Sequence, residues 1–324
     1  MEGLTDLKCA VFCGGNSSER EISLSTGEGV YRALVASGIK TIIVDLTTEE
    51  ETEIRKIIYK NNIDVVFIAM HGRFGEDGEL QKILERIGVS YTGSAFEGSL
   101  NAFDKVRTRI ILKKYGILQP EFYFVKKQEK GRQVMNFKWD RCVVKPARQG
   151  SSIGVKICIN VKDYYEALNA VFAIDEVAVI EKYIPGRELT VGIVGDYPLV
   201  PVGIVPLKSS HFDFSSKYTP GTTFYEVPAR VDVEIARRAK EVAFTVHRVL
   251  GLRHFSRIDM IVSPGGEIFV LEANSIPGLT PTSLLPKAAF FEGISYQQLC
   301  KIMLQMAIET VSYTHLRAHE TRHD

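Results

Sequence analysis

The stretch Arg257–Asn274 reads RIDMIVSPGGEIFVLEAN and decides the fold of the C-terminal part of this chain. Two runs rich in β-forming residues flank Gly265-Gly266, a pattern typical of a β-hairpin with a two-residue turn. Such a turn fixes which residues of the two strands face one another. Counted outward from the turn, the predicted pairs are Ile261 with Val270, Asp259 with Glu272, and Arg257 with Asn274.

The hairpin should carry a polar cluster on one face, because side chains along a strand alternate between faces with period two. Asp259 and Glu272 would lie directly opposite one another, and two opposed carboxylates repel unless a cation bridges them. A hard divalent cation such as Mg²⁺ is the natural bridge, since it takes oxygen ligands and keeps substrate phosphates in its coordination shell. A solvated polar face on an exposed hairpin is the alternative interpretation.

The segment 143–155 reads VVKPARQGSSIGV and combines a strand, a loop rich in glycine and serine, and a second strand. Lys145 stands at the end of the first strand, and the backbone N–H groups of such a loop can form an anion-binding concavity near its ammonium. The Walker A pattern is absent, and the segment 13–18, CGGNSS, does not fit the dinucleotide-binding pattern GxGxxG. The sequence therefore favours a phosphate site of another kind.

A possible nucleotide contact follows in the segment 179–188, which reads VIEKYIPGRE. This apolar strand ends in an acidic, a basic and an aromatic residue, which together suit a purine ring and its ribose. An ordinary strand end is an equally good interpretation of the segment alone.

The N-terminal part alternates strands with helices, which predicts a parallel α/β sheet. The expected strands are 7–13, 41–46 and 65–70, with helices 19–37 and 50–61 between them. Ligands gather at the carboxyl ends of parallel strands. Two polar clusters, 14–19 and 71–78, stand directly after expected strands, so we expect both at a binding edge.

The rest of the chain predicts further units of mixed α+β character. We expect a first unit over residues 1–100, a central unit over 101–186 and a third over 187–311. The third contains a polar, aromatic stretch, 208–223, and loops of that length are usually functional or disordered. Residues 312–324 hold His315, His319 and His323 and resemble the translation of a sequencing adapter. We expect this tail to be non-native and disordered, with a metal-binding tail as the alternative.

The composition is that of an ordinary globular protein, with 45% hydrophobic and 24% charged residues. The formal net charge of +1 gives no global field that favours nucleic acid or an acidic membrane as partner. The five cysteines include no CxxC pair, so we expect buried, reduced thiols. No signal peptide is recognisable, and no apolar run reaches the roughly 20 residues that span a bilayer. We therefore expect a cytoplasmic protein.

Taken together, these segments resemble the ATP-grasp fold and, more closely, the D-alanine–D-alanine ligase family, over residues 8–308. The segments that resemble the family's motifs are 14–24 (GGNSSEREISL), 71–78 (HGRFGEDG), 91–94 (YTGS), Asp104-Lys105, 257–259, 272–274 and 277–280. The implied fold has α/β and α+β parts: an ATP-grasp fold preceded by a parallel α/β domain that binds substrate.

The resemblance implies a role for individual positions. ATP would be bound by Lys105, Lys145, Glu181, Lys182, Tyr183, Ile184, Glu188 and Lys217, with Glu181 and 182–184 at the adenine and Glu188 at the ribose. Mg²⁺ or Mn²⁺ would be held by Asp259, Glu272 and Asn274. The catalytic groups would be Glu19, Ser151, Tyr218, Arg257 and the backbone N–H of Gly278. The amino-acid substrates would contact Glu19, His71, Ser283 and Leu284.

The implied reaction is the phosphorylation of one D-alanine carboxylate by ATP, followed by attack of the amine of a second D-alanine. Such chemistry needs charge neutralisation and in-line positioning rather than a protein nucleophile. The acyl phosphate must be kept from water, so we expect 208–223 to act as a closing lid. The resemblance also implies a homodimer and a role in peptidoglycan precursor synthesis.

The chain departs from many relatives at two places. Phe212 and Phe214 stand where many relatives have tyrosines, although Lys217-Tyr218 is retained and favours D-alanine over D-lactate as acceptor. Pro281-Thr282 stands where many relatives carry Ser-His, which affects the region that would hold the second substrate.

Three alternatives remain open at the level of the sequence. The first is a ligase of the same class with D-serine or D-lactate as acceptor, since one methyl or hydroxyl group gives limited discrimination. The second is a non-catalytic nucleotide-binding relative, and the third is a Rossmann oxidoreductase, which the missing fingerprint disfavours.

Overall fold

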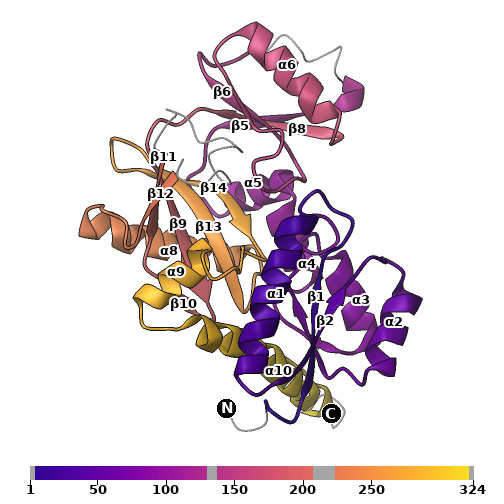
Figure 1. Ribbon diagram of the computed structural model, residues 1–324. Coiled ribbons are helices and arrows are strands. Elements are labelled where there is room, and N and C mark those ends of the chain that lie inside the picture. Colours follow the sequence, from indigo (N-terminus) through magenta and orange to yellow (C-terminus); the bar gives the residue numbers. More distant parts are fainter. Residues whose placement is uncertain (1–3, 130–136, 207–222, 321–324) are drawn as a thin grey trace.

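The computed structural model describes residues 4–129, 137–206 and 223–320, and these form three sheets with their covering helices (Figure 1). The parallel sheet of the N-terminal residues lies at one end of the molecule. A small sheet under α6 (Val161–Phe172) lies at the other end. The largest sheet stands between them, so each end sheet can form a cavity with it.

The N-terminal sheet has the strand order β2-β1-β3-β4, and all its pairs are parallel. Its elements are β1 (Lys8–Cys13), α1 (Arg20–Ala36), β2 (Lys40–Asp45), α2 (Glu51–Lys60), β3 (Val65–Ile68), α3 (Glu79–Ile87) and β4 (Ser90–Tyr91). Alternate residues of β1 face two different cores: Val11 packs with α1, whereas Phe12 packs with α2 and α3. The predicted parallel α/β architecture is confirmed.

The small sheet has the order β5-β8-β6-β7 and is antiparallel throughout. Its strands are β5 (Phe122–Lys126), followed by the short helix η1 (Lys127–Glu129), then β6 (Cys142–Pro146), β7 (Lys156–Cys158) and β8 (Val177–Lys182). Helix α6 covers one face, where Tyr164, Leu168 and Val171 are buried against the strands. The loop between β6 and β7 carries the glycine- and serine-rich segment toward the largest sheet.

The largest sheet has the order β12-β11-β9-β13-β14, with the short β10 paired to β9. Its strands are β9 (Arg187–Val194), β10 (Tyr197–Pro198), β11 (Val202–Pro206), β12 (Thr223–Glu226), β13 (Phe255–Val262) and β14 (Ile268–Asn274). The helices around it are α4 (Phe96–Phe103), α5 (Lys105–Lys114), α8 (Val233–Val249) and α9 (Leu284–Phe291). Helix α8 buries Ala239, Ala243 and Val246 against the sheet, and α9 packs against β9.

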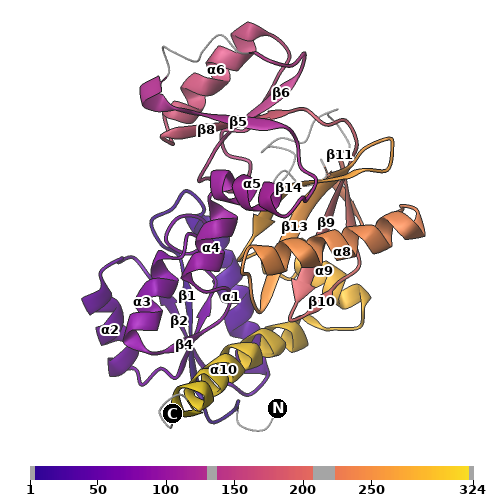
Figure 2. The ribbon, with the colours of Figure 1, turned by 180° about the vertical axis from the view of Figure 1, so that it is seen from behind.

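The last helix, α10 (Tyr296–Glu320), returns to the N-terminal sheet, where it packs against α1 and β4 (Figure 2). The helix continues to Glu320, and the expectation that residues 312–324 are non-native and disordered stays a prediction. No glycine or proline interrupts 296–320, and each residue added to a formed helix gains a backbone hydrogen bond. Residues 321–324 lie outside the described residues.

The predicted hairpin forms, with one correction to its register. Arg257 pairs with Asn274 and Asp259 with Glu272, as expected, but Ile261 pairs with Phe269 rather than Val270. The loop has three residues, because the N–H of Ser263 bonds the carbonyl of Glu267. Gly266 takes a positive φ of +79°, which closes such a loop. A bulge beside Asp259 restores the predicted register at the site.

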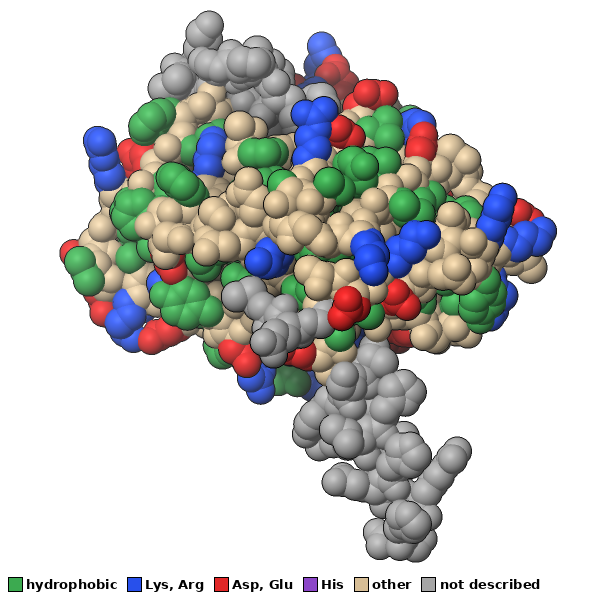
Figure 3. Space-filling model, turned by 60° about the horizontal axis from the view of Figure 1, so that its bottom comes forward, with side chains coloured by type: hydrophobic (Ala, Val, Ile, Leu, Met, Phe, Trp, Pro, Cys, Tyr) green, Lys and Arg blue, Asp and Glu red, His purple; other side chains and the backbone are tan. Residues whose placement is uncertain are grey.

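Charged side chains are interspersed on the face that Figure 3 shows, where acidic groups lie beside basic ones among the described residues. This mixture agrees with the formal net charge of +1. Within the described ranges, none of the helices is both long and apolar enough to cross a membrane. All five cysteines are buried and unpaired by disulfides, as expected from the sequence.

A buried histidine joins the N-terminal unit to the segment before β13. His254 Nδ1 accepts the N–H of Gly93 at 3.1 Å, so its Nε2 carries the hydrogen that bonds Thr310 Oγ1 at 2.7 Å. Burial, together with the neighbouring Arg253 cation, lowers the pKa of His254 to about 3. Protonation of Nδ1 would remove the acceptor of the Gly93 N–H.

We expect the folded protein to lose stability as the pH falls below about 6.5. The unfolded chain then binds a proton at this histidine while the folded chain does not, so stability is complete above pH 6.5 and falls toward the folded pKa of about 3. Between pH 7 and pH 5 the part of this loss that comes from His254 should be about 1–2 kcal/mol. Thermal melts should show His254→Gln losing less over this interval than the wild type; equal losses would contradict the assignment.

Candidate active site

Two cavities meet at the carboxylates of the hairpin. A cavity of about 540 Å³ lies between the small sheet and the largest sheet, and a cavity of about 740 Å³ lies between the N-terminal unit and the largest sheet. Asp259 and Glu272 line both cavities. A ligand in one cavity can therefore react with a ligand in the other directly beside these two side chains.

Asp259 is held in a fixed orientation by its neighbours. Arg257 donates from Nε and Nη2 to the two carboxylate oxygens, each at 2.9 Å. Thr190 on β9 donates its hydroxyl to Oδ1 at 2.5 Å, and Asn274 donates its amide to Oδ2 at 3.2 Å. Because Asp259 is 3% exposed, these contacts also satisfy a charge that is largely removed from water.

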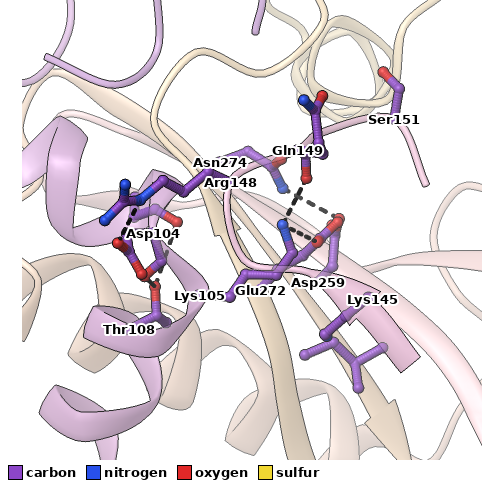
Figure 4. A network of polar contacts seen from close by, with 12 residues as sticks. Asp104, Lys105, Thr108, Lys145, Arg148, Gln149, Ser151, Asp259, Glu272 and Asn274 are labelled. Atoms are coloured by element: carbon purple, nitrogen blue, oxygen red, sulfur yellow. Dashed lines mark hydrogen bonds and ion pairs between the residues drawn. The ribbon is translucent and has the colours of Figure 1, made fainter. Parts of the chain in front are cut away.

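Glu272 is less constrained than Asp259. Its carboxylate lies 3.9 Å from Lys105 Nζ, and its side chain is 28% exposed (Figure 4). Two carboxylates and the Asn274 amide, whose rotation presents its carbonyl oxygen, form an oxygen-ligand set that suits Mg²⁺. No cluster of three or more His, Cys, Asp and Glu side chains suited to a metal occurs within residues 4–129, 137–206 and 223–320. The remaining ligands of such an ion would therefore come from phosphates and water.

Two of the predicted phosphate-binding lysines lie near these carboxylates. Lys105 begins α5 and donates to the carbonyl of Gln149 at 2.7 Å, which holds the β6–β7 loop close to the hairpin (Figure 4). Lys145, near the end of β6, lies 2.9 Å from Glu181 Oε2 and lines the smaller cavity. Burial lowers the pKa of Lys145 despite the adjacent carboxylate.

Glu181 is part of a buried ion-pair cluster. Arg109 Nη2 lies 2.6 Å from Oε1, and Lys145 binds the other oxygen. Burial tends to raise the pKa of Glu181, but the two cations outweigh it and hold the pKa below its usual range. The other residues expected at the nucleotide, Lys182, Tyr183, Ile184 and Glu188, line the same cavity.

Glu19 and His71 lie together in the larger cavity, each coming from the carboxyl end of a strand of the parallel sheet. Glu19 accepts a hydrogen bond from Ser151 through Oε1, whereas its buried Oε2 has no hydrogen-bond partner among the described residues. Burial and the nearby Glu76 raise the pKa of Glu19. An anionic oxygen oriented in this way suits a cationic ligand such as an ammonium group.

The hydrogen bonds of His71 fix the orientation of its ring. Nε2 lies 3.0 Å from Thr26 Oγ1, and Nδ1 lies 3.1 Å from Glu76 Oε1. Thr26 belongs to α1 and Glu76 to the loop after β3, so the ring is held from both sides of the binding edge.

The opposite wall of the larger cavity contains Gly278, Ser283 and Leu284. Ser283 precedes α9, accepts the N–H of Thr280 at 3.1 Å, and lies 2.7 Å from the Thr280 hydroxyl. A Cβ placed on Gly278 would come within 3.1 Å of the Ser283 hydroxyl, so glycine keeps this wall open. Lys217 and Tyr218, and the lid expected over 208–223 apart from Thr223, lie outside the described residues.

Several residues of the site were not singled out from the sequence. These residues are Thr26, Arg109, Thr190, Tyr225 and Lys287. Thr190 could have been found, because it is a polar residue inside the apolar run of β9, and such a residue is buried only with a partner. Arg109 gave no such signal, since it occurs in a helix with several exposed basic residues.

The three-sheet architecture, with paired cavities that meet at opposed carboxylates, is that of an ATP-grasp enzyme, the class of ATP-dependent carboxylate–amine ligases. Family models described as "D-ala D-ala ligase N-terminus" and "D-ala D-ala ligase C-terminus" match residues 47–94 and 110–305. The chain therefore belongs to the D-alanine–D-alanine ligase family. A Rossmann oxidoreductase is excluded by this membership.

Individual members of the family are similar in sequence to this chain over nearly their whole length. The D-alanine–D-alanine ligase of Carboxydothermus hydrogenoformans is 35% identical over 94% of this chain and 99% of its own. The enzyme of Methylacidiphilum infernorum is 38% identical over 96% of this chain and 97% of its own.

Solved structures show the same fold. The crystal structure of the Bacillus anthracis D-alanine–D-alanine ligase complexed with ATP superposes with a TM-score of 0.80, at 31% identity over 95% of this chain and 99% of that one. The VanG D-Ala:D-Ser ligase of Enterococcus faecalis also superposes with a TM-score of 0.80, at 28% identity over 93% and 99%. Ligases with different acceptors therefore share this fold.

Proposed function

We propose that this chain joins two D-alanine molecules into D-alanyl-D-alanine at the expense of ATP, for peptidoglycan precursor synthesis. The observation that carries the proposal is that Asp259 and Glu272 line both cavities. ATP in the smaller cavity can then present its γ-phosphate to a carboxylate in the larger one.

The first step transfers the γ-phosphoryl group to a carboxylate oxygen of the first D-alanine, with ADP as the leaving group. Lys105 and Lys145 neutralise phosphate charge, while 182–184 and Glu188 hold the adenine and the ribose. Mg²⁺ or Mn²⁺ held by Asp259, Glu272 and Asn274 would supply further charge neutralisation to the phosphates. Glu181 acts mainly through Lys145, because its carboxylate is already engaged by two cations.

The free oxygen of Glu19 binds the ammonium of the first D-alanine, with His71 beside it. Ser151 holds the carboxylate of Glu19 through its hydroxyl, so it positions this contact. The carboxylate of the bound D-alanine then points toward the hairpin, where the two cavities meet.

The second step is attack of the neutral amine of the second D-alanine on the carbonyl carbon of the acyl phosphate. A tetrahedral intermediate forms and inorganic phosphate leaves. Arg257 and the N–H of Gly278 stabilise the oxyanion, since both lie in the lining of the larger cavity. Ser283 and Leu284 hold the second D-alanine, and Lys217 and Tyr218 complete the site from the lid.

The wider setting is also part of the proposal. The chain would divide into the units 1–100, 101–186 and 187–311, and the enzyme would act as a cytoplasmic homodimer on small molecules. Cytoplasmic ATP and the buried, unpaired thiols favour that compartment. Acceptors such as D-serine or D-lactate remain the alternative outcome of the same assay.

The test is phosphate release from ATP and Mg²⁺ with D-alanine, beside L-alanine, D-serine, D-lactate and a blank without amino acid. We expect release with D-alanine together with the dipeptide, detected by mass spectrometry. Dipeptide formation only with a different acceptor would move the function within the ligase class. Absence of release with every substrate would contradict the proposal.

A further inference from the structure

The larger cavity is rich in carboxylates and contains few cations. Its acidic lining residues are Glu19, Glu21, Glu76, Asp259 and Glu272. Of the cationic lining residues, Arg257 is occupied by Asp259. The other is Lys287, which has no carboxylate within 4 Å among the residues that the structure describes. Among the described residues that line this cavity, Lys287 is therefore a cation whose charge no protein carboxylate neutralises.

Lys287 lies next to the residues expected to hold the second substrate. Its backbone N–H bonds the carbonyl of Ser283 at 3.0 Å, so it stands one turn after Ser283 at the start of α9. Its ammonium lies 4.7 Å from the centre of the Tyr225 ring, and Tyr225 also lines the cavity. A ring face holds a cation in place without neutralising it, unlike a carboxylate.

The acceptor amino acid presents two groups to this cavity. Its amine is consumed in the reaction, but its carboxylate is not and must be bound throughout. A carboxylate that enters a cavity lined by five others is repelled unless a cation faces it. The N-terminal end of α9 adds partial positive charge from the helix dipole. Lys287 and the start of α9 together offer such a carboxylate a binding place.

We propose that Lys287 is a specificity-determining residue, which binds the carboxylate of the acceptor amino acid beside Ser283. The inference rests on the proposed function and adds to it the group that selects α-amino acids over amines without a carboxylate. Lys287 does not contact the donor or the nucleotide in this arrangement. Its loss should therefore affect the acceptor alone.

The experiment is an internal competition between two acceptors, with D-alanine as donor. D-Alanine and D-alaninamide are mixed with ATP, and the products D-alanyl-D-alanine and D-alanyl-D-alaninamide are quantified by mass spectrometry. The variants are Lys287→Met and Lys287→Arg. The matched control is Lys240→Met, because Lys240 lies over the Tyr197 ring at 5.3 Å but does not line the cavity.

In Lys287→Met, the preference for D-alanine over D-alaninamide should fall by about 10–100-fold, the usual effect of losing one hydrogen bond to a charged group. The KM for ATP should stay the same, Lys287→Arg should retain most of the preference, and Lys240→Met should behave as wild type. An unchanged preference in Lys287→Met would overturn the inference alone. A wild-type enzyme that forms no dipeptide would instead overturn the proposed function on which it rests.

Discussion

Replacement of Glu272 by glutamine should lower kcat/KM by about a thousandfold or more while the fold remains intact. Glu272 lies on β14 at the edge of the largest sheet, and among the described residues its side chain forms an ion pair only with Lys105, at 3.9 Å. The negative charge of the Glu272 carboxylate is therefore available to a metal ion that binds together with the phosphates. Loss of one anionic ligand removes several kcal/mol of stabilisation from the phosphoryl-transfer transition state.

The measurement is steady-state phosphate release over a range of Mg²⁺ and Mn²⁺ concentrations, with melting temperature as the check on the fold. Glu267→Gln is the matched control, since Glu267 is an exposed carboxylate on the same hairpin. We expect the control to keep wild-type activity. Full activity of Glu272→Gln at low metal concentration would exclude Glu272 as a metal ligand.

The hairpin shows which features of a local structure can be predicted from its own sequence. Period-two alternation correctly brought Asp259 and Glu272 opposite one another, although the predicted two-residue turn was wrong. The two deviations cancel, because the three-residue loop and the bulge shift the register in opposite senses. The bulge could not be predicted from the strand alone, since its carbonyls are held by Arg109 from α5.

The N-terminal sheet was predictable for a simpler reason. Parallel strands buried on both faces read as continuous apolar runs, and β1 and β3 are such runs. The position of α10 on that sheet was not predictable, because the partner of an amphipathic helix is chosen by tertiary packing. No pattern in residues 296–311 indicates that this helix returns to the first unit.

Some residues of the candidate site could be predicted from the sequence, and others could not. The clusters 14–19 and 71–78 were expected at a binding edge from topology, and the structure places Glu19 and His71 in one cavity. The proximity of Ser151 to Glu19 followed only from the family resemblance, because 132 residues separate them. Lys287 was overlooked, since its significance depends on what the other cations of the cavity bind.

Arg109→Met should destabilise the protein more than any single surface substitution. Arg109 is 1% exposed and bonds Glu181, the carbonyl of Val270 at 2.7 Å and the carbonyl of Leu271 at 2.6 Å. Methionine fills much of the space but donates no hydrogen bond. Removing one partner of a buried ion pair costs about 3–5 kcal/mol, because the remaining charge is left without compensation.

Arg109→Met should affect the active site as well as the stability of the fold, because Arg109 joins the small sheet at Glu181 to the bulge of β14. We expect a melting temperature several degrees lower, and weaker ATP binding, since Lys145 would then be the remaining ion-pair partner of Glu181 among the described residues. Arg237→Met is the matched control: Arg237 pairs with Glu234 and Glu241 on the exposed face of α8, where such pairs contribute at most about 1 kcal/mol. Equal melting temperatures for the two variants would show that the buried cluster does not stabilise the junction between the two sheets.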